Sequence, residues 1–557
     1  MINFSASPWL KRISLWLLPL TFLAVFFFFP LSRILALTLS PEALTSKNLP
    51  ITTYTLLFTF YQAFLSTLLT LVLGLPSAVL FARFNFRGKS LLRALTAVPF
   101  MLPTVVVAAA FNSLLGSRGL LNTLITNYQL PTTASSSFIV HPFLAILLAH
   151  VFYNTTIVIR IVGTALSSLD PKLEQTARSL GADPLRVWTH VTLPLLRPSI
   201  LTASLLVFLF DFTSFGVILL LGGSQFATLE VEIYLQAVKL LNLPLAALLS
   251  VIQLVCTLVF SLLYSHLVTR NSYPLQPRSL TLKPRTLQQK LFVFTFCSLL
   301  TVYFALPLAS LPVRSLFRLE ADRGQRAEIQ YGVTAGYYKE LFINRRGSVF
   351  YVPPIRAAFN SLAYASATVL LSLLLGFPAA FALAKPSRLE KILDPLIMLP
   401  LGSSAVMLGL GFIITYGKWL TSPFLVPFAH TLIALPFVIR TLQPAIASIP
   451  QRLRDAASTL GASPFEVWKH IDLPILRRAA LAAATFAFTV SLGEFGATLL
   501  ISRPEYPTIP VAIERFLSQP GGLNYGQAMA MATLLMLITT VSILLIEKFR
   551  PPAAGDF

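Results

Sequence analysis

Charged residues are scarce in this 557-residue chain: Asp, Glu, Lys and Arg together make up 11% of it, whereas a soluble domain carries about 25%. Hydrophobic residues make up 55%. A chain with so few polar side chains cannot cover a globule of this size in water. The composition therefore excludes a soluble protein and predicts a membrane protein.

Acidic residues are scarcer than basic ones, with 21 Asp and Glu against 42 Lys and Arg. An excess of positive charge gathered on one surface would indicate a nucleic-acid partner. Here the basic residues lie mostly in short loops between apolar runs, where they set the orientation of a protein in the membrane. We therefore expect contact with membrane lipid and no nucleic-acid partner.

The chain has only two cysteines, Cys256 and Cys297, and each falls inside an apolar run. Neither lies at a spacing typical of metal ligands, so we predict no disulfide framework and no metal site. A phosphate-binding loop is also missing: the nearest match, Arg87-Gly88-Lys89-Ser90, has Arg83 where the pattern requires its first glycine. The chain is therefore predicted to bind no nucleotide or other cofactor and to be no enzyme.

Long apolar runs are what the chain has in abundance. A membrane-spanning helix needs about 20 apolar residues, and about twelve runs qualify: 15–37, 56–82, 91–115, 138–166, 195–221, 241–268, 291–311, 357–384, 392–416, 424–442, 475–501 and 529–546. Lys11 and Arg12 precede the first run as in a signal peptide, but the run is too long for one, and we interpret it as a retained span. The predicted fold class is an all-α polytopic membrane protein.

The basic loops predict the orientation. Lys and Arg cluster at residues 11–12, 83–93, 171–198, 269–288, 385–391, 451–478 and 548–550, which all fall on one side if the twelve runs cross in turn. That side is the cytoplasm by the positive-inside rule, so both termini are predicted to be cytoplasmic. The long loop over residues 312–354 mixes Arg with Glu and Asp, and we place it outside.

An internal repeat divides the chain. Residues 173–197, LEQTARSLGADPLRVWTHVTLPLLR, recur at 453–477 as LRDAASTLGASPFEVWKHIDLPILR, 280 positions later. Six spans per half make both halves enter the membrane in the same direction, so we predict two parallel six-helix repeats related by an axis along the membrane normal. The predicted division is a first repeat over 1–268 with its loop at 171–198, a cytoplasmic linker over 269–288, and a second repeat over 289–557 with its loop at 451–478.

Further pairs of matching residues extend this repeat beyond the loops. They are GLP at 74–76 with GFP at 376–378, MLP at 101–103 with MLP at 398–400, His150 and Arg160 with His430 and Arg440, and Phe215-Gly216 with Phe495-Gly496.

Each repeated loop predicts two helices joined by a sharp turn. Asp170-Pro171 starts the first helix and Gly181 ends it in a left-handed conformation. The second helix starts at Asp183-Pro184, and in the other copy Ser463 and Glu466 form a capping box.

The second helix of each loop exposes an apolar pair, Leu185 and Trp188 or Phe465 and Trp468, which suits a groove on a partner protein. An amphipathic helix pair lying at the headgroup boundary is the alternative. Such a pair does not need the same glycine and Leu-Pro spacing twice.

The loops resemble the EAA loop of bacterial ABC importer permeases, whose pattern is Glu-Ala-Ala, three residues, Gly, nine residues, Ile or Val, one residue and Leu-Pro. The first copy reads Gln175-Thr176-Ala177, Gly181, Val191 and Leu193-Pro194, with Glu174 just before, and the second reads Asp455-Ala456-Ala457, Gly461, Ile471 and Leu473-Pro474. The first copy thus departs from the pattern at two of its three namesake positions, and the second only by having Asp for Glu.

In that family the loop docks in a cleft of an ATP-hydrolysing subunit. The resemblance implies two copies of a separate ABC ATPase subunit that binds the ATP, an extracytoplasmic solute-binding protein, and the plasma (inner) membrane of a bacterium or archaeon. The implied coupling residues are Glu174, Gln175, Ala177, Gly181, Leu185, Trp188, Asp455, Ala456, Ala457, Gly461, Phe465 and Trp468.

Two acidic residues, Asp211 and Glu494, lie near the outer ends of the fifth and eleventh spans, each just before a Phe-Gly pair. Charges inside spans are rare and usually functional. Either they line the translocation path and meet a cationic substrate, or they cap a helix break at the glycine. Gln62, Tyr153 and Asn154 either contact substrate or hold helices together.

Other polar residues in the spans are assigned structural roles. His150 and His430 are expected to make structural hydrogen bonds, and Arg160 and Arg440 to extend to the inner membrane surface.

The expected solute is a small cation. The stretch from Ser214 to Tyr234 is similar to thiamine permeases, and the two-half plan is shared with ferric iron permeases. Two other functions remain open at this stage. A secondary transporter also uses six plus six helices but does not explain a repeated docking loop, and a membrane scaffold does not need polar residues in matched spans.

Overall fold

The computed structural model describes residues 8–122, 141–270, 281–318, 332–344, 352–419 and 422–549. Within them, eleven helices are long and apolar enough to cross a membrane, or twelve if one bent pair counts as a single span. The prediction of an all-α polytopic membrane protein with about twelve spans is confirmed. Part of the predicted linker (271–280) and parts of the predicted outer loop (319–331 and 345–351) lie outside the described residues.

The first half begins with one long span, α1 (Pro8–Leu23) and α2 (Phe29–Thr38), joined by a π-helical turn. The helices that follow are α3 (Asn48–Arg83), α4 (Lys89–Met101), α5 (Thr104–Leu115), α7 (Pro142–Ser168), α8 (Pro171–Ser179), α9 (Pro184–Val187), α10 (Leu193–Phe212), α11 (Gly216–Gly222), α12 (Leu229–Tyr234) and α13 (Leu243–Arg270).

The second half begins with α14 (Leu287–Leu316) and a short outer element made of β1 (Phe317–Arg318), β2 (Gly332–Val333) and α15 (Gly336–Glu340). The two strands pair antiparallel. The remaining helices are α16 (Ile355–Ala384), α17 (Arg388–Gly402), α18 (Ala405–Tyr416), α19 (Leu425–Ala447), α20 (Gln451–Thr459), α21 (Pro464–Val467), α22 (Leu473–Gly493), α23 (Gly496–Ile501), α24 (Ile509–Leu517) and α25 (Gly522–Phe549).

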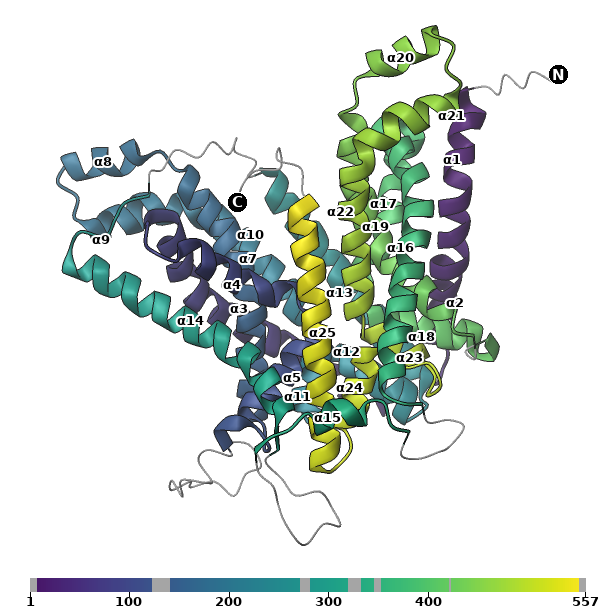
Figure 1. The fold of residues 1–557 in the computed structure, drawn as a ribbon, viewed down its shortest axis with the longest axis horizontal. Helices are drawn as coiled ribbons and strands as arrows, with labels where there is room; N and C mark the ends of the chain where they lie inside the picture. The colour runs from purple at the N-terminus through teal and green to yellow at the C-terminus, as the bar shows by residue number, and fades with distance from the viewer. Residues whose placement is uncertain are drawn as a thin grey trace.

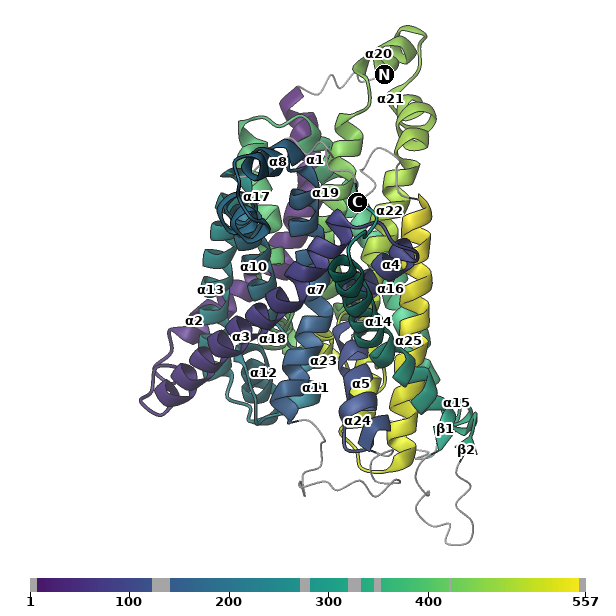
Figure 2. The same cartoon turned by 90° about the vertical axis from the view of Figure 1, so that its left-hand side faces the viewer.

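The two halves have the same helix order and the same packing. α3 packs against α7 and α10, and α16 packs against α19 and α22 in the same way. The short helices α8 and α9 lie at the same end of the molecule as α20 and α21, although on opposite flanks (Figure 1). The beginning of α1 and the end of α25 lie at this end too, which we call the coupling end (Figures 1 and 2).

The first span of each half packs against the other half. α1 and α2 contact α16 and α18, and the indole of Trp16 donates a hydrogen bond to Glu390 across 3.3 Å. α14 contacts α4 and α5, and Ser310 Oγ donates to the carbonyl of Ala110 across 3.1 Å. Each first span also packs against the last helix of its own half, α2 against α13 and α14 against α25, and so joins the two halves.

Several spans are broken where the apolar runs predicted continuity. The run 392–416 contains a 95° bend between α17 and α18. Ser404 caps α18 by accepting hydrogen bonds from the backbone N–H groups of Val406 and Met407. The runs 195–221 and 475–501 are likewise interrupted, because α10 ends at Phe212 and α22 at Gly493, and short helices follow.

The repeated glycines Gly74 and Gly376 let two helix pairs approach closely. A Cβ atom at Gly74 would lie 2.7 Å from Cβ of Val158, and one at Gly376 would lie 2.7 Å from Cγ1 of Val438. Both valines come from the next long helix of their half, at positions that are 280 apart. These glycines therefore fix the α3–α7 and α16–α19 contacts.

The described part of the predicted outer loop lies at the end opposite the coupling end, where α15 packs against α25 (Figure 1). The ring of Tyr337 occupies the space above Gly526, because a Cβ there would come within 2.2 Å of the ring. Tyr337 is buried, so this aromatic contact anchors the outer element on the last span.

We predict that Gly74→Leu and Gly376→Leu each lower the free energy of unfolding by about 1–3 kcal/mol, because the added side chain overpacks a closed helix contact. Thermal unfolding of the purified protein in detergent measures the effect. The control is Gly417→Leu, where no atom lies within 4 Å of the new Cβ. Equal melting temperatures for all three variants would contradict the assignment.

Candidate functional site

The repeated loops form the predicted helix–turn–helix units. The side chain of Asp170 accepts a hydrogen bond from the backbone N–H of Lys172 and starts α8, and Asp183 does the same for α9 through Arg186. In the second copy Ser463 and Glu466 form the predicted capping box. The second helix is only one turn long and continues through a π-helical turn into the long helix α10 or α22.

Gly181 and Gly461 have left-handed backbones, with φ angles of 86° and 87°. This turn lets the N–H of Ala182 bond to the carbonyl of Ala177, and that of Ala462 to Ala457, which closes each first helix. Nothing lies within 4 Å of a Cβ at either glycine. Backbone conformation, and not crowding, therefore requires glycine at both positions.

Both loops present exposed apolar side chains at the coupling end. Leu185 and Phe465 are exposed as predicted, and Phe465 stacks on Trp468 with ring centroids 6.0 Å apart. Leu460 is 89% exposed and Leu180 nearly as much, although the sequence analysis did not select them. Their position directly before the left-handed glycine was the available signal.

Trp188 differs from the prediction that it is part of the exposed pair. It is partly buried against the core of the first half, with the Arg83 guanidinium 5.5 Å from its ring centroid. Only Trp468 of the two tryptophans is exposed. The exposed apolar surface of the first loop therefore consists of its leucines.

Glu174, predicted as a coupling residue, is held by its own chain. Its carboxylate forms an ion pair with Arg83 and accepts a hydrogen bond from Thr192 across 2.7 Å. In the second copy Arg454 occupies the equivalent position and pairs with Asp472 across 2.8 Å. Each loop is thus stabilised by an ion pair at the same position of its first helix, where the first loop has the acidic partner and the second loop the basic one.

The other predicted coupling residues of the first turn lie at the surface of the helices. Gln175, Asp455 and Ala456 are exposed, whereas Ala177 and Ala457 are half-buried. The Asp455 side chain accepts a hydrogen bond from Gln451 across 3.0 Å.

A cavity of about 400 Å³ lies between the two halves, at the breaks that follow α10 and α22. Its wall includes Asp211, Asn154 and Glu494, three of the four residues predicted for the substrate path. The fourth, Gln62, does not line it. Gln62 lies behind His150, and its amide is 2.7 Å from Nδ1 of that histidine.

Asp211 and Asn154 form the polar wall of the first half. The Asn154 amide donates a hydrogen bond to Oδ1 of Asp211 across 2.7 Å, and both side chains are 1% exposed. Oδ2 of Asp211 and Oδ1 of Asn154 have no hydrogen-bond partner within the described structure. Asp211 does not cap α11, so the alternative that both acidic residues cap helix breaks is wrong for this half.

Both carboxylate oxygens of Glu494 have hydrogen-bond partners. Its carboxylate accepts hydrogen bonds from the backbone N–H groups of Ala497 (2.8 Å) and Thr498 (3.0 Å) and from the Thr498 hydroxyl. Nε2 of His430 lies 3.2 Å from it. The helix-cap alternative therefore fits this half.

The acidic residue of the cavity wall lies at a different repeat position in each half. Position 211 corresponds to Ser491 and position 494 to Ser214, because the repeat is offset by 280. His150 Nε2 lies 2.8 Å from Ser214 Oγ, and Nδ1 of His430 lies 2.7 Å from Ser491 Oγ. Nδ1 of His150 also lies 3.6 Å from Oδ1 of Asp211, so each half joins one buried histidine to one carboxylate, which the sequence did not predict.

Two more features of the cavity were not predicted from the sequence. The carboxylate of Glu230, a buried residue of α12, accepts hydrogen bonds from Gln253 and from Ser404 of the other half. Phe215 and Phe495 meet across the two halves with ring centroids 5.3 Å apart. The duplicated Phe-Gly pair was the signal for this contact, which closes one side of the cavity.

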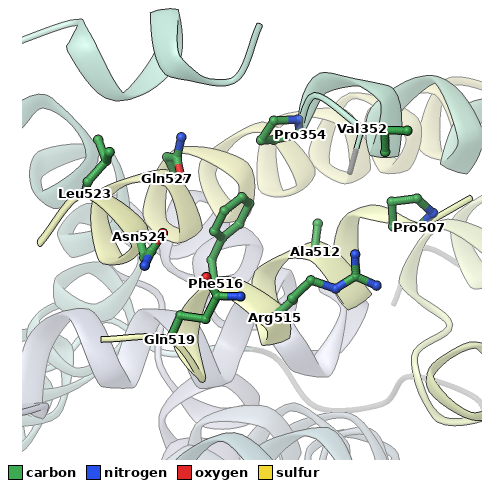
Figure 3. Close-up of a pocket in the computed structure, with 10 residues that line it drawn as sticks. All are labelled: Val352, Pro354, Pro507, Ala512, Arg515, Phe516, Gln519, Leu523, Asn524 and Gln527. Carbon is green, nitrogen blue, oxygen red and sulfur yellow. The ribbon is translucent and has the colours of Figure 1, made fainter. Parts of the chain in front are cut away.

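A smaller pocket of about 110 Å³ lies away from the coupling end, between α24, the start of α25 and the segment before α16 (Figure 3). Arg515, Gln519, Asn524 and Gln527 contribute polar side chains to it, and Phe516 an aromatic ring.

Comparison with known proteins assigns the family. The family described as "Binding-protein-dependent transport system inner membrane component" matches twice, at residues 70–273 and 372–551. The chain is 27% identical over 504 residues to "Thiamine transport system permease protein ThiP" of Escherichia coli, covering 88% of each chain.

Other relatives are matched over similar shares of their length. The Brucella abortus (strain 2308) protein with the same name is 27% identical, covering 88% of this chain and 86% of the relative. "Probable ABC transporter permease protein y4fN" of Sinorhizobium fredii is 23% identical, covering 89% and 88%. With both halves matched, the chain belongs to the binding-protein-dependent transport system inner membrane components, as a fused-type permease of ABC importers.

Proposed function

We propose that this chain is the membrane-spanning subunit of an ATP-driven importer that moves thiamine, delivered by an extracytoplasmic binding protein, into the cytoplasm. The observation that carries the proposal is a cavity between two halves that each end in an exposed helix–turn–helix loop. Two copies of an ABC ATPase bind these loops, one per loop, and supply the ATP hydrolysis.

The cavity fits a cation that has N–H groups and an aromatic body. Two buried acceptors, Asp211 Oδ2 and Asn154 Oδ1, lack partners among the described residues, and buried acceptors are costly unless they are hydrogen-bonded. Tyr153, Phe210 and Phe215 line the same cavity. Thiamine has a positively charged ring, an amino group and two aromatic rings, and proteins named for its transport are among the relatives of this chain.

Asp211 and Glu494, two of the three carboxylates of the cavity, have different tasks in this proposal. Asp211 meets the substrate because it has a free oxygen, whereas Glu494 holds the start of α23 and with it the position of Phe495. The Phe215–Phe495 contact is the outer closure of the cavity.

The proposal also includes an orientation in the membrane. The coupling end faces the cytoplasm and holds both the start of α1 and the end of α25 (Figure 1). The opposite end, with α15 and the pocket of Figure 3, faces the binding protein.

An ion-gradient-driven transporter is the competing function, and purification separates the two. We expect the chain to co-purify with an ATPase subunit, and proteoliposomes of the complex with its binding protein to accumulate labelled thiamine only with ATP inside. Mass spectrometry of the ligand retained by the binding protein checks the substrate independently. Uptake by the purified chain alone, driven by an ion gradient, would overturn the proposal.

Replacing Gly181 or Gly461 by valine is expected to reduce ATPase recovery and uptake. A β-branched residue in the left-handed region costs about 1–2 kcal/mol and distorts the turn. Because the second loop is nearer the family pattern, we expect a larger loss for Gly461→Val than for Gly181→Val. Asparagine, which tolerates this backbone, is the control at both positions, and equal losses for the two valine variants would refute the asymmetry.

Asp211→Asn is expected to lower thiamine uptake about tenfold or more, because a hydrogen bond to a charged group contributes about 1.5–3 kcal/mol. For an analogue with an uncharged ring in place of the thiazolium, uptake by Asp211→Asn should be close to uptake by the wild type. Glu494→Gln should keep the preference for the cation even where it lowers the rate, since it acts on the helix cap. Unchanged thiamine uptake by Asp211→Asn at normal protein level would remove Asp211 from the substrate path.

A further inference from the structure

The end of the linker between the two halves, residues 281–288, lies against the first loop. It forms one wall of a groove of about 490 Å³, whose other walls come from the ends of α3 and α7 and from α8. The start of α14, which follows the linker, lies on the same flank of the coupling end as α8 and α9 (Figure 1). The linker is therefore in a position to act on the first loop.

A parallel β-bridge holds the linker to the corner that follows α3. The backbone N–H of Leu282 donates a hydrogen bond to the carbonyl of Arg83 across 2.9 Å, and the N–H of Asn85 donates to the carbonyl of Leu282 across 3.0 Å. The rings of Phe84 and Phe292 add a contact, with centroids 5.9 Å apart. The linker thus fixes the backbone of the last residue of α3 from outside that helix.

The other end of this short segment is fixed as well. Thr286 and Gln289 form a capping box at the start of α14. The side chain of Gln289 also accepts a hydrogen bond from the backbone N–H of Arg285 across 2.9 Å. Only three residues separate Leu282 from Thr286, so the segment between the bridge and α14 has little freedom to move.

Arg83 joins this bridge to the first loop. Its guanidinium forms an ion pair with Glu174 of α8 and lies 5.5 Å from the ring centroid of Trp188, in the π-helical turn after α9. Glu174 accepts a second hydrogen bond from Thr192. The residue that the linker holds by its backbone therefore contacts both parts of the loop by its side chain.

The second loop is stabilised without such a segment. Arg454 and Asp472, which pair across 2.8 Å, stand at the positions of Glu174 and Thr192 and both belong to the loop itself. The corner after α16, at 384–387, forms no β-bridge with any part of the chain that the structure describes. Because the first loop has threonine in place of Asp472, its charged partner comes from the end of α3 instead.

We infer that the linker positions the first loop through Arg83. The bridge at Leu282 fixes the end of α3, and Arg83 fixes α8 through Glu174. The inference rests on the proposed function where it concerns the ATPase: a loop already held in place loses less freedom when that subunit binds. The linker then supports the loop that departs further from the family pattern.

The test breaks the bridge from either side with proline, which has no backbone N–H to donate. Leu282→Pro removes the bond to Arg83, and Asn85→Pro removes the bond to Leu282. The residue before Asn85 is already extended, with φ −108° and ψ 143°, as a residue before proline prefers. Leu282→Ala and Asn85→Ala are the matched controls, because both keep the N–H and both native side chains are exposed.

Amide hydrogen exchange of the full-length protein in detergent, read by mass spectrometry, measures the stability of α8, with α20 of the second loop as internal reference. We expect exchange in α8 to be about threefold faster or more in both proline variants, since each loses one backbone hydrogen bond. Exchange in α20 should stay unchanged. In a chain that carries Arg83→Gln, Leu282→Pro should change α8 by less than about twofold, because the bridge acts through Arg83.

Equal exchange in the proline and alanine variants, or faster exchange in α8 and α20 alike, would overturn the inference. This measurement requires neither an ATPase nor thiamine, so its outcome is independent of the proposed function. The share of ATPase subunit that co-purifies is expected to fall with the proline variants and to stay at the wild-type level with the alanine variants. Faster exchange in α8 with unchanged ATPase recovery would overturn the role of the linker in coupling.

Discussion

A buried polar group inside a bilayer has no water to bond with, so it must find its partners within the protein. The centre of this molecule is arranged around that constraint. His430 is satisfied by Ser491, Thr498 and Glu494, and His150 by Gln62 and Ser214. One wall of the cavity is therefore complete, whereas the other leaves acceptor oxygens of Asp211 and Asn154 without a partner among the described residues.

The same constraint explains how the halves diverged without losing their common architecture. The acidic residue beside each buried histidine occupies a different repeat position in each half, since Asp211 aligns with Ser491 and Glu494 with Ser214. The loops show a second exchange, in which Glu174 with Arg83 is replaced by Arg454 with Asp472. In both cases the same region keeps a carboxylate with a polar or basic partner while the residue types change places.

The spans and the loop caps could be predicted because their signals are local: apolar runs mark the helices, and Asp170, Ser463 and the two glycines mark their ends. The 95° bend between α17 and α18 could not, since an apolar run is equally long whether it is straight or bent. The exchange of first spans and the pairing of His150 with Ser214 depend on contacts between distant parts of the chain. Trp188 was misjudged for the same reason, because its cover comes from Arg83.

The long helices connect the coupling end directly to the cavity. From Pro184 in the first loop to Phe212 beside Asp211, the chain forms one helical span of 29 residues, which at 1.5 Å per residue is about 43 Å long. The corresponding span of the second half runs from Pro464 to Gly493, next to Glu494. If an ATPase binds the loops as proposed, a movement of a loop would be passed along this span toward the carboxylate near its far end. In each half, one continuous helical span thus has the exposed glycine turn at one end and the buried acidic residue at the other.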